Sequence, residues 1–454
     1  MTISRTLFAH DEPTFGRRRF MLGTAAVAGV AASGLALPSG AVAGGLSTVR
    51  PAMADTLLDS FGVVIHPSWK ETEYADHDAI LAWLLKLRIR HVRTRLTPQK
   101  PVLAFFKKLG ANGIKVNAVC GALGDPQTMD SLMKAVADNF PEPTAVFSAF
   151  EGINEPNNDG VPWIDETRAK TQALYEARQK YGLTAIPIIA PALARVSGGG
   201  VEGNDTFTQA QNLGDMSEWL DGGTMHVYPR ALPPSNGIDY FTSCARQVAG
   251  SKPITVTEGG YFTAKNYSGG ARRVSSGVAA AYGPQKLLEH LRAGNTRYFR
   301  YELLEKPTGR SWDRLATFGM LRTDSSTWRP KPEFDSTRRL LARFRDPGPA
   351  FTPAPLTFGL SGGPSSLRSM VFAKRDGTHL VALWLDKPIW DPDRERLTVS
   401  GIADRLATVT LDLGSARDGV VSHVVTGSKR KVFGRTTSVN VPLTAGVTVV
   451  RLRP

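Results

Sequence analysis

Short apolar runs alternate with amphipathic stretches along the sequence from Ser60 to Asp346. This is the pattern of repeated strand–helix units around a parallel sheet, and several of the runs are apolar throughout, as strands buried on both faces are. Eight units over roughly 285 residues are typical of a (β/α)8 TIM barrel, so the sequence predicts an α/β fold of this kind. The eight predicted strands lie at residues 62–66, 89–93, 114–119, 145–155, 185–190, 224–228, 254–258 and 298–303.

The stretches between these runs carry helix signals. Pro101 and Gly110 bracket residues 102–109, with the proline in the first turn and the glycine after the last apolar position. Residues 285–292 place leucines on one face and are followed by Gly294. Both segments are predicted to be helices.

The composition changes at the Asp-Pro-Gly-Pro segment 346–349, which ends the predicted barrel domain of residues 55–346. Short β-rich runs follow, and Asp376-Gly377 between the first two is a hairpin turn signal. Their spacing predicts an antiparallel β-sandwich over residues 350–454. The predicted strands lie at residues 370–374, 380–385, 397–399, 409–413, 420–425, 438–443 and 447–452.

The first residues have the features of an export signal. Arg17 and Arg18 precede an uncharged run of mostly small residues at 22–37, and Ala41-Val42-Ala43 offers a small-x-small cleavage pattern. The segment resembles a bacterial twin-arginine signal, which implies removal of residues 1–43 and a periplasmic or extracellular location. A later cleavage, after residue 54, and an uncleaved membrane anchor are the alternatives.

The composition argues against other classes of protein. The 55 Lys and Arg outnumber the 41 Asp and Glu, giving a net charge of +14, but the basic residues are scattered and form no patch of the kind that binds nucleic acid. Neither Cys120 nor Cys244 has His or Cys companions at metal-ligand spacing. We therefore expect no nucleic-acid partner, no metal and no cofactor.

Chemically active side chains stand at the ends of three predicted strands. The fourth strand ends with Glu155, the sixth with His226 and Tyr228, and the seventh with Glu258. Because the carboxyl ends of barrel strands share one cleft, the two glutamates are expected to face each other across it. Hydrolysis of a glycosidic bond with retention needs two such carboxyl groups about 5–5.5 Å apart.

The Asn-Glu-Pro triplet 154–156, followed by His-x-Tyr on the sixth strand and a glutamate on the seventh, resembles clan A, the superfamily of retaining (β/α)8 glycoside hydrolases that includes families 5, 30, 39 and 79. Phe-Gly-Met-Leu at 318–321 and Lys-Pro at 331–332 extend the resemblance toward the last barrel helix. The resemblance implies that Glu155 is the acid/base, Glu258 the nucleophile and Asn154 the donor to the sugar 2-hydroxyl.

The same resemblance implies supporting roles for further residues. Tyr228, together with His226, is expected beside the nucleophile, where the tyrosine would hydrogen-bond it, and Arg93 is expected to steady its charge. Arg95 shares a strand face with Arg93, so the period-two geometry alone leaves the choice between them open. His226 and Tyr228 could instead be ordinary core residues.

Other readings remain for the acids and aromatic residues. Glu155 could start a helix beside a proline, and Glu258 could be a loop residue before two glycines. Glu302, Trp312 and Tyr261 are expected to line sugar subsites, where aromatic faces stack on sugar rings; the alternative for the two aromatic residues is plain loop packing. For Glu151, deep in the fourth strand, we expect an ion pair with a neighbouring strand.

These observations predict a retaining glycoside hydrolase that cleaves O-glycosidic bonds of an extracellular oligo- or polysaccharide by double displacement. The basic charge is compatible with an anionic or cell-wall polysaccharide. No stable membrane insertion is expected once the signal is removed. The alternative is a non-catalytic carbohydrate-binding protein on the same fold.

Overall fold

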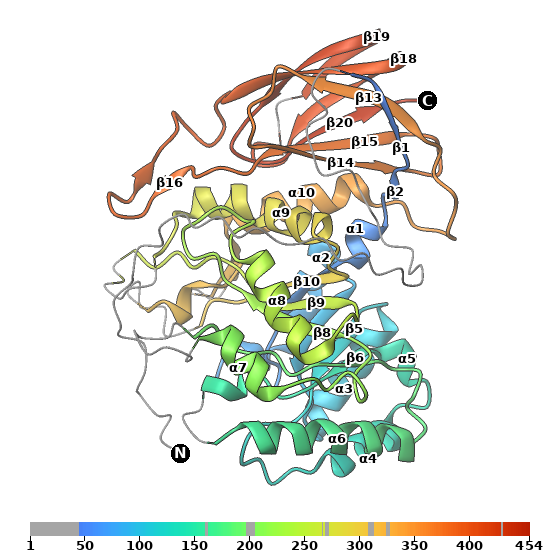
Figure 1. Cartoon of the computed structure of the whole chain (residues 1–454), viewed down its shortest axis with the longest axis vertical. Coiled ribbons are helices and arrows are strands. Elements are labelled where there is room, and N and C mark those ends of the chain that lie inside the picture. The colour runs from blue at the N-terminus through green and yellow to red at the C-terminus, as the bar shows by residue number, and fades with distance from the viewer. Residues whose placement is uncertain are drawn as a thin grey trace.

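Parallel strands form a closed barrel in the computed structural model, which describes residues 45–158, 162–196, 205–265, 267, 272–306, 313–323, 327–427 and 430–454. Hydrogen bonds link the strands in the order β7-β6-β5-β4-β3-β10-β9-β8, and a bridge between Ile189 and Gly222 closes the ring. The predicted TIM barrel is confirmed (Figure 1). Its strands are β3 (Phe61–Val64), β4 (His91–Arg95), β5 (Lys115–Val119), β6 (Phe147–Glu151), β7 (Ile188–Ile189), β8 (Gly223–Val227), β9 (Ile254–Gly259) and β10 (Arg297–Arg300).

Helices follow the strands as the alternating sequence pattern predicts. They are α1 (Thr56–Asp59), α2 (His77–Leu87), α3 (Lys100–Ala111), α4 (Met129–Asn139), α5 (Pro143–Val146), α6 (Ile164–Lys180), α7 (Thr206–Leu213), α8 (Ile238–Ala249), α9 (Ser276–Arg292) and α10 (Pro332–Phe344), with 3-10 turns at Glu73–Ala75, Pro156–Asn158 and Leu315–Thr317. Short strand pairs form between β11 (Leu321–Arg322) and β12 (Arg329–Pro330), and between β16 (Trp390–Asp391) and β17 (Arg396–Leu397).

Some predicted boundaries are wrong. The fourth strand starts at Phe147, because residues 143–146 form the short helix α5 with Pro143 in its first turn. Gly110 lies inside α3 instead of after it. The helix predicted at 285–292 is only the second half of α9, which runs through the buried Pro284.

The C-terminal strands form a mainly antiparallel sheet to which the N-terminal residues contribute. Its order is β1-β13-β18-β20-β15-β14-β2, with β19 on β18. Because β1 (Ser47–Val49) and β2 (Ala52–Met53) are adjacent in the chain yet occupy opposite ends of this order, the sheet must curl back into two layers, which enclose an apolar core. The other strands are β13 (Leu356–Ser361), β14 (Leu367–Ala373), β15 (His379–Leu385), β18 (Ala407–His423), β19 (Arg430–Leu443) and β20 (Thr448–Leu452).

Several strand predictions in the C-terminal region are corrected by the structure. The runs 409–413 and 420–425 belong to one long strand, β18, whose register shifts between Asp412 and Gly419. The strand β13 was not predicted, and the run 397–399 supplies only the end of the two-residue strand β17.

The predicted export signal lies outside the described residues. No helix in the part of the chain that the structure describes has both the length and the apolar character to cross a membrane.

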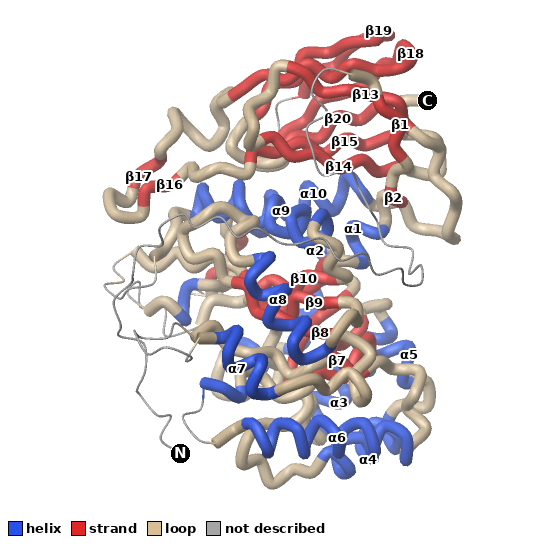
Figure 2. Tube along the Cα trace, viewed as in Figure 1, coloured by secondary structure: helices blue, strands red, loops and turns tan. Residues whose placement is uncertain are grey.

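The helices α9 and α10 lie between the barrel and the C-terminal sheet, as Figure 2 shows. Leu287 and Leu288 of α9 share one apolar core with Trp384 of β15 and with the barrel residues. The indole Nε1 of Trp384 also donates a hydrogen bond of 2.7 Å to Glu289 Oε1. The sheet is therefore held against the barrel by buried apolar surface and by a buried polar contact.

We predict that Trp384→Ala lowers the free energy of unfolding by about 3–5 kcal/mol, because it leaves a cavity at this contact and removes the hydrogen-bond donor to Glu289 Oε1. Denaturation of the full chain in guanidinium chloride measures the loss. Val432→Ala, which truncates a 72% exposed side chain of the same sheet, should change the value by less than about 0.5 kcal/mol. Equal effects of the two substitutions would contradict the prediction.

Candidate active site

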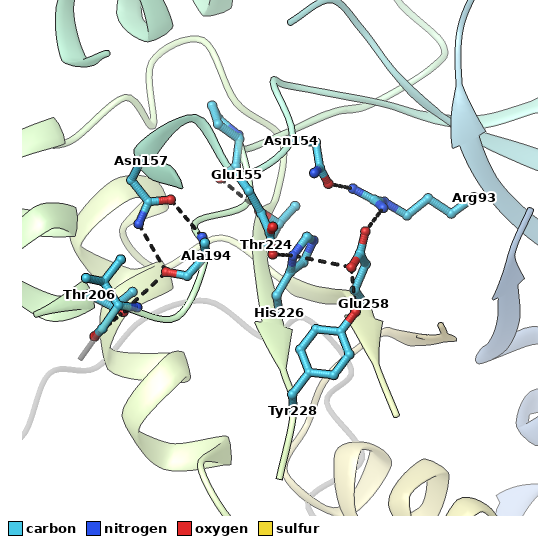
Figure 3. Close-up of polar contacts among 12 residues, drawn as sticks. Arg93, Asn154, Glu155, Asn157, Ala194, Thr206, Thr224, His226, Tyr228 and Glu258 are labelled. Atoms are coloured by element: carbon cyan, nitrogen blue, oxygen red, sulfur yellow. Dashed lines mark hydrogen bonds and ion pairs between the residues drawn. The ribbon is translucent and has the colours of Figure 1, made fainter. Parts of the chain in front are cut away.

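The polar side chains predicted at strand ends converge on one end of the barrel, as Figure 3 shows. Glu258 lies near the end of β9, His226 lies near the end of β8, and Tyr228 directly follows β8. Glu155 lies beyond the end of β6, at the start of a 3-10 turn. Arg93 reaches this group from the middle of β4. The barrel thus brings together residues that are up to 165 positions apart in the chain.

Arg93 is the centre of the hydrogen-bond network. Its Nε and Nη2 atoms donate to the two carboxylate oxygens of Glu151, each over 2.8 Å, and its Nη1 donates to Glu258 Oε1 over 2.6 Å. Nη2 also donates to Asn154 Oδ1 over 2.6 Å. Arg95 instead lies at the exposed rim and pairs with Asp125. The choice that the sequence left open is thereby settled: Arg93 contacts Glu258, and the expected ion pair of Glu151 is confirmed.

Glu258 has a second donor on its other oxygen. The hydroxyl group of Tyr228 donates to Oε2 over 2.6 Å, and His226 Nδ1 lies 3.7 Å from the same oxygen. Burial alone raises the pKa of this carboxyl group, but the charges of His226 and Arg93 and the tyrosine hydrogen bond outweigh burial and hold the pKa below its ordinary value. Glu258 is therefore a carboxylate at neutral pH.

The imidazole of His226 links Glu155 to the rest of the network. The Nδ1 atom lies 2.7 Å from Glu155 Oε1. Burial lowers the pKa of His226, whereas the neighbouring charges of Glu258 and Glu155 raise it, with a net rise above its ordinary value. One oxygen of each glutamate and one nitrogen of His226 lie within 4.8 Å of one another. The two carboxyl groups thus face each other at close range.

The backbone at Glu155 is strained. Its φ of 47° lies in the left-handed region, which non-glycine residues seldom adopt. The conformation is held by the chain beyond β7, because the Glu155 N–H donates to Ala192 O over 2.8 Å and Asn154 forms a β-bridge with the same residue.

Glu155, His226 and Glu258 offer three close ligand atoms that a metal ion could use. The surroundings are unfavourable for a cation, however. Both oxygens of Glu258 already accept hydrogen bonds, one of them from the guanidinium of Arg93. A metal ion here would compete with that positive charge. The arrangement suits two carboxyl groups acting on an organic substrate better than it suits a metal centre.

An aromatic wall of the site, formed by His66, Trp69 and Tyr301, was missed by the sequence analysis. The ring of His66, just beyond β3, stacks on Trp69 with 3.8 Å between centroids and lies edge-on to Tyr301, 5.9 Å away. Tyr301 in turn lies 6.3 Å from the ring of Tyr228. His66 ends the first predicted strand, so its position at a strand end was a signal that could have identified it.

Glu302, predicted to contact substrate, is fully buried behind this wall. Its Oε2 accepts a 2.9 Å hydrogen bond from the hydroxyl group of Tyr74 and lies 3.3 Å from His66 Nε2. The carboxyl group is therefore placed to orient His66. In this arrangement the carboxyl group of Glu302 does not contact solvent.

Of the two remaining predicted residues, Tyr261 does not join the site. Tyr261 is 1% exposed, its hydroxyl group donates to Leu232 O, and its ring packs against Tyr282 of α9. Because a ring buried in this way has no free face for a sugar, the subsite prediction for Tyr261 is corrected. Trp312 lies outside the described residues.

Comparison with known proteins establishes the fold. No protein-family model and no curated protein matches this chain. A glucosidase from Croceicoccus marinus aligns with a TM-score of 0.59 at 11% identity over 92% of this chain and 100% of its own. A monomeric β-xylosidase from Caulobacter crescentus CB15 aligns at 0.55 and 14% identity over 90% and 98%. A GH39 enzyme from Xanthomonas axonopodis pv. citri aligns at 0.51 and 12% identity over 89% and 96%.

We predict that Tyr228→Phe raises the pKa of Glu258, because the lost hydroxyl group donates to the charged form of the carboxyl group. At pH 7 the free energy of unfolding should fall by about 1.5–3 kcal/mol, the usual worth of a hydrogen bond to a charged group. A carboxyl group whose pKa is lowered by folding stabilises the fold above its unfolded pKa and loses that effect as the pH falls through the folded value. The difference between wild type and variant should therefore shrink below about pH 4.3.

Carbon-13 NMR titration of labelled glutamate and denaturation at several pH values provide the measurements. Tyr181→Phe is the matched control, since Tyr181 donates to the exposed carboxylate of Asp130 over 3.0 Å. The control substitution should lower the free energy of unfolding by less than about 1 kcal/mol. The prediction would be refuted if Tyr228→Phe lowered the free energy of unfolding by no more than the control does and if this loss did not vary with pH.

Proposed function

We propose that this protein is a retaining glycoside hydrolase in which Glu155 is the acid/base and Glu258 the nucleophile. The observation that carries the proposal is the approach of the two carboxyl groups to within 4.8 Å between oxygens at one end of a TIM barrel. Retaining enzymes hold such groups about 5–5.5 Å apart, whereas inverting enzymes hold them about 6.5–9.5 Å apart to admit a water molecule. The fold shared with the glucosidase and the β-xylosidase supports a glycoside hydrolase in general.

The environments of the two glutamates match the two roles. Glu258 is ionised and fixed between Arg93 and Tyr228, so its carboxylate is oriented for attack on an anomeric carbon. The side chain of Glu155 is 26% exposed, compared with 11% for Glu258. It can therefore reach the leaving-group oxygen, give up its proton and later take a proton from the incoming water molecule.

Asn154 and the aromatic wall would position the sugar. The Oδ1 atom of Asn154 accepts from Arg93, which leaves the amide N–H donors for the 2-hydroxyl group that the resemblance to clan A assigns to this residue. Trp69, which stacks on His66, and Tyr301, which lies edge-on to it, are partly exposed aromatic residues of the kind that contact sugars. We propose an oligo- or polysaccharide as substrate. Removal of residues 1–43 would take away four arginines and two acids, so the net charge would be 14 − 4 + 2 = +12, which is compatible with an anionic or cell-wall polymer.

We predict that Glu258→Ala lowers turnover on the best substrate of a glycan panel by at least roughly 10³-fold, because the attacking group is lost. Glu155→Gln should also abolish measurable release of reducing ends. Glu218→Ala, which truncates an exposed acid of the barrel, is the control and should leave turnover unchanged. Full activity of Glu258→Ala would sink the nucleophile assignment, and failure of the wild type on every glycan would favour a non-catalytic carbohydrate-binding protein.

We further propose that the protein is exported through the twin-arginine pathway and acts in the periplasm or outside the cell. Cleavage after Ala43 would leave β1 and β2 in place, whereas cleavage after Ala54 would remove both strands from the C-terminal sheet. The earlier cleavage site is therefore the one that we propose.

Exchange of both Arg17 and Arg18 for lysine should retain the uncleaved chain in the cytoplasm. Immunoblots of fractionated cells, with N-terminal sequencing of the exported form, test this. Export of the lysine variant at the wild-type level would contradict the proposed route. A mature N-terminus at Asp55 would contradict the proposed cleavage site.

A further inference from the structure

The strands β16 and β17 form a short hairpin outside the main C-terminal sheet, on the side where barrel loops gather (Figure 2). The hairpin belongs to residues 386–397, which follow β15 and are called the hairpin segment below. Trp390 pairs with Leu397 across the hairpin. The side chain of Trp390 is buried in an apolar cluster with barrel residues and does not belong to the core of the C-terminal sheet. The hairpin segment therefore packs on the barrel.

The chain that follows β9 is fixed to the hairpin segment at Arg273. Its Nε and Nη2 atoms donate to the two carboxylate oxygens of Glu395, the first over 2.6 Å. The indole Nε1 of Trp390 donates to Arg273 O over 2.9 Å, and the guanidinium group lies 5.7 Å from the centre of the indole ring. Val274, next in the chain, is fully buried in the same apolar cluster as Trp390. Both the side chain and the backbone of Arg273 are thus held by the C-terminal domain.

The chain that follows β8 contacts the same segment. Ser235 Oγ donates to Asp386 Oδ2 over 2.7 Å, and Ala231 is buried in the apolar cluster that contains the hairpin tryptophan. Tyr261, in the chain after β9, donates from its hydroxyl group to Leu232 O over 3.0 Å. The hairpin segment therefore holds the chains after both strands, and these two chains also bond to each other.

These two chains begin directly after Tyr228 and Glu258. The backbone N–H of Val274 donates to the carbonyl oxygen of Phe262 over 3.2 Å. The ring of Phe262 lies 5.5 Å from the ring of Phe318, which in turn lies 5.5 Å from the ring of Tyr228. Tyr228 is the donor to Glu258 Oε2. A continuous series of contacts thus leads from the hairpin segment to the proposed nucleophile.

We propose that the hairpin segment positions the active site, because it holds the chains after β8 and β9 and so keeps Tyr228 oriented to donate to Glu258. Arg273 and Trp390 are the positioning residues. The effect on catalysis rests on the proposed function, whereas the effect on Tyr228 rests on the contacts alone. Misplacement of a reacting group by about 1 Å, caused by a distant substitution, can lower the rate by roughly 10²-fold. The C-terminal domain is then part of the catalytic unit.

Two substitutions in the full chain test this role. Trp390→Phe keeps an aromatic ring in the cluster and removes the donor to Arg273 O, whereas Arg273→Met removes both hydrogen bonds to Glu395. The matched control is Arg272→Met, since Arg272 adjoins Arg273 and its ion pair with Asp393 is exposed at both ends. Each test variant should lower kcat on the best glycan by at least about fivefold, at a temperature where circular dichroism shows it to be folded. The control should keep the wild-type kcat.

The pKa of Glu258 separates positioning from a general loss of stability. A displaced Tyr228 hydroxyl group donates less well to the charged form of the carboxyl group, so the pKa of Glu258 should rise in both test variants. The acidic limb of the pH profile of kcat/KM, which reports ionisation in the free enzyme, should move to higher pH. Carbon-13 NMR titration of labelled glutamate should show the same rise without any substrate.

Wild-type kcat and an unchanged pKa of Glu258 in both test variants would overturn the proposal. A lower kcat without a raised pKa, or equal losses in Arg272→Met, would also overturn it, because either result shows a general response to substitution. If the wild type cleaves no glycan, the proposed function fails, and the NMR titration decides the positioning alone. A raised pKa of Glu258 in Trp390→Phe and Arg273→Met then supports it, and an unchanged pKa overturns it.

Discussion

The guanidinium group of Arg93 is the interaction on which the candidate site depends. It is 3% exposed and bonds to Glu151, Glu258 and Asn154, which belong to β6, β9 and the turn after β6. Arg93 and Glu151 are both buried, which is tolerated only because each charge has a partner with good geometry. Removing one partner from such a buried pair usually lowers the free energy of unfolding by about 3–5 kcal/mol. The same contacts that neutralise the barrel interior therefore also fix the position of Glu258.

This network makes the two facing glutamates unlike each other. Glu258 is held by Arg93 on one oxygen and by Tyr228 on the other, whereas Glu155 is held by His226 and is more exposed. Two carboxyl groups in unlike surroundings can take an attacking and a proton-transferring role in one reaction. The proposed division of roles therefore rests on the neighbours that each carboxyl group has. Glu258 contacts Arg93 of β4 and Tyr228 just after β8, whereas Glu155 lies in the strained turn after β6 and contacts His226 of β8.

Much of this arrangement could be predicted from local sequence pattern. Apolar runs located the eight barrel strands, and strand-end position singled out Glu155, Glu258, His226 and Tyr228, because a closed parallel sheet places all carboxyl ends at one edge. Glu151 was expected in an interior ion pair for a general reason, the cost of an unpaired buried charge. These predictions needed only the strand order, which the barrel fold dictates.

Features that depend on distant partners were missed. β1 and β2 are too short to identify alone, and they are strands only because β13 and β14, about 300 residues away, complete their hydrogen bonds. Tyr261 follows β9 as an aromatic subsite residue would, yet α9 covers its ring. His66 contacts Glu302 and Tyr74, which are bonded to each other and come from opposite ends of the barrel sequence. In each case tertiary packing decides what the residue does.

The stereochemistry of the first-formed product is the most direct test of the central claim. Proton NMR of the anomeric region, recorded in heavy water during the first minutes of hydrolysis of the best glycan, reports the configuration before mutarotation. The close approach of Glu155 and Glu258 predicts a product with the same anomeric configuration as the substrate. Release of the opposite anomer would show that water attacks directly, and would contradict the assignment of Glu258 as a nucleophile.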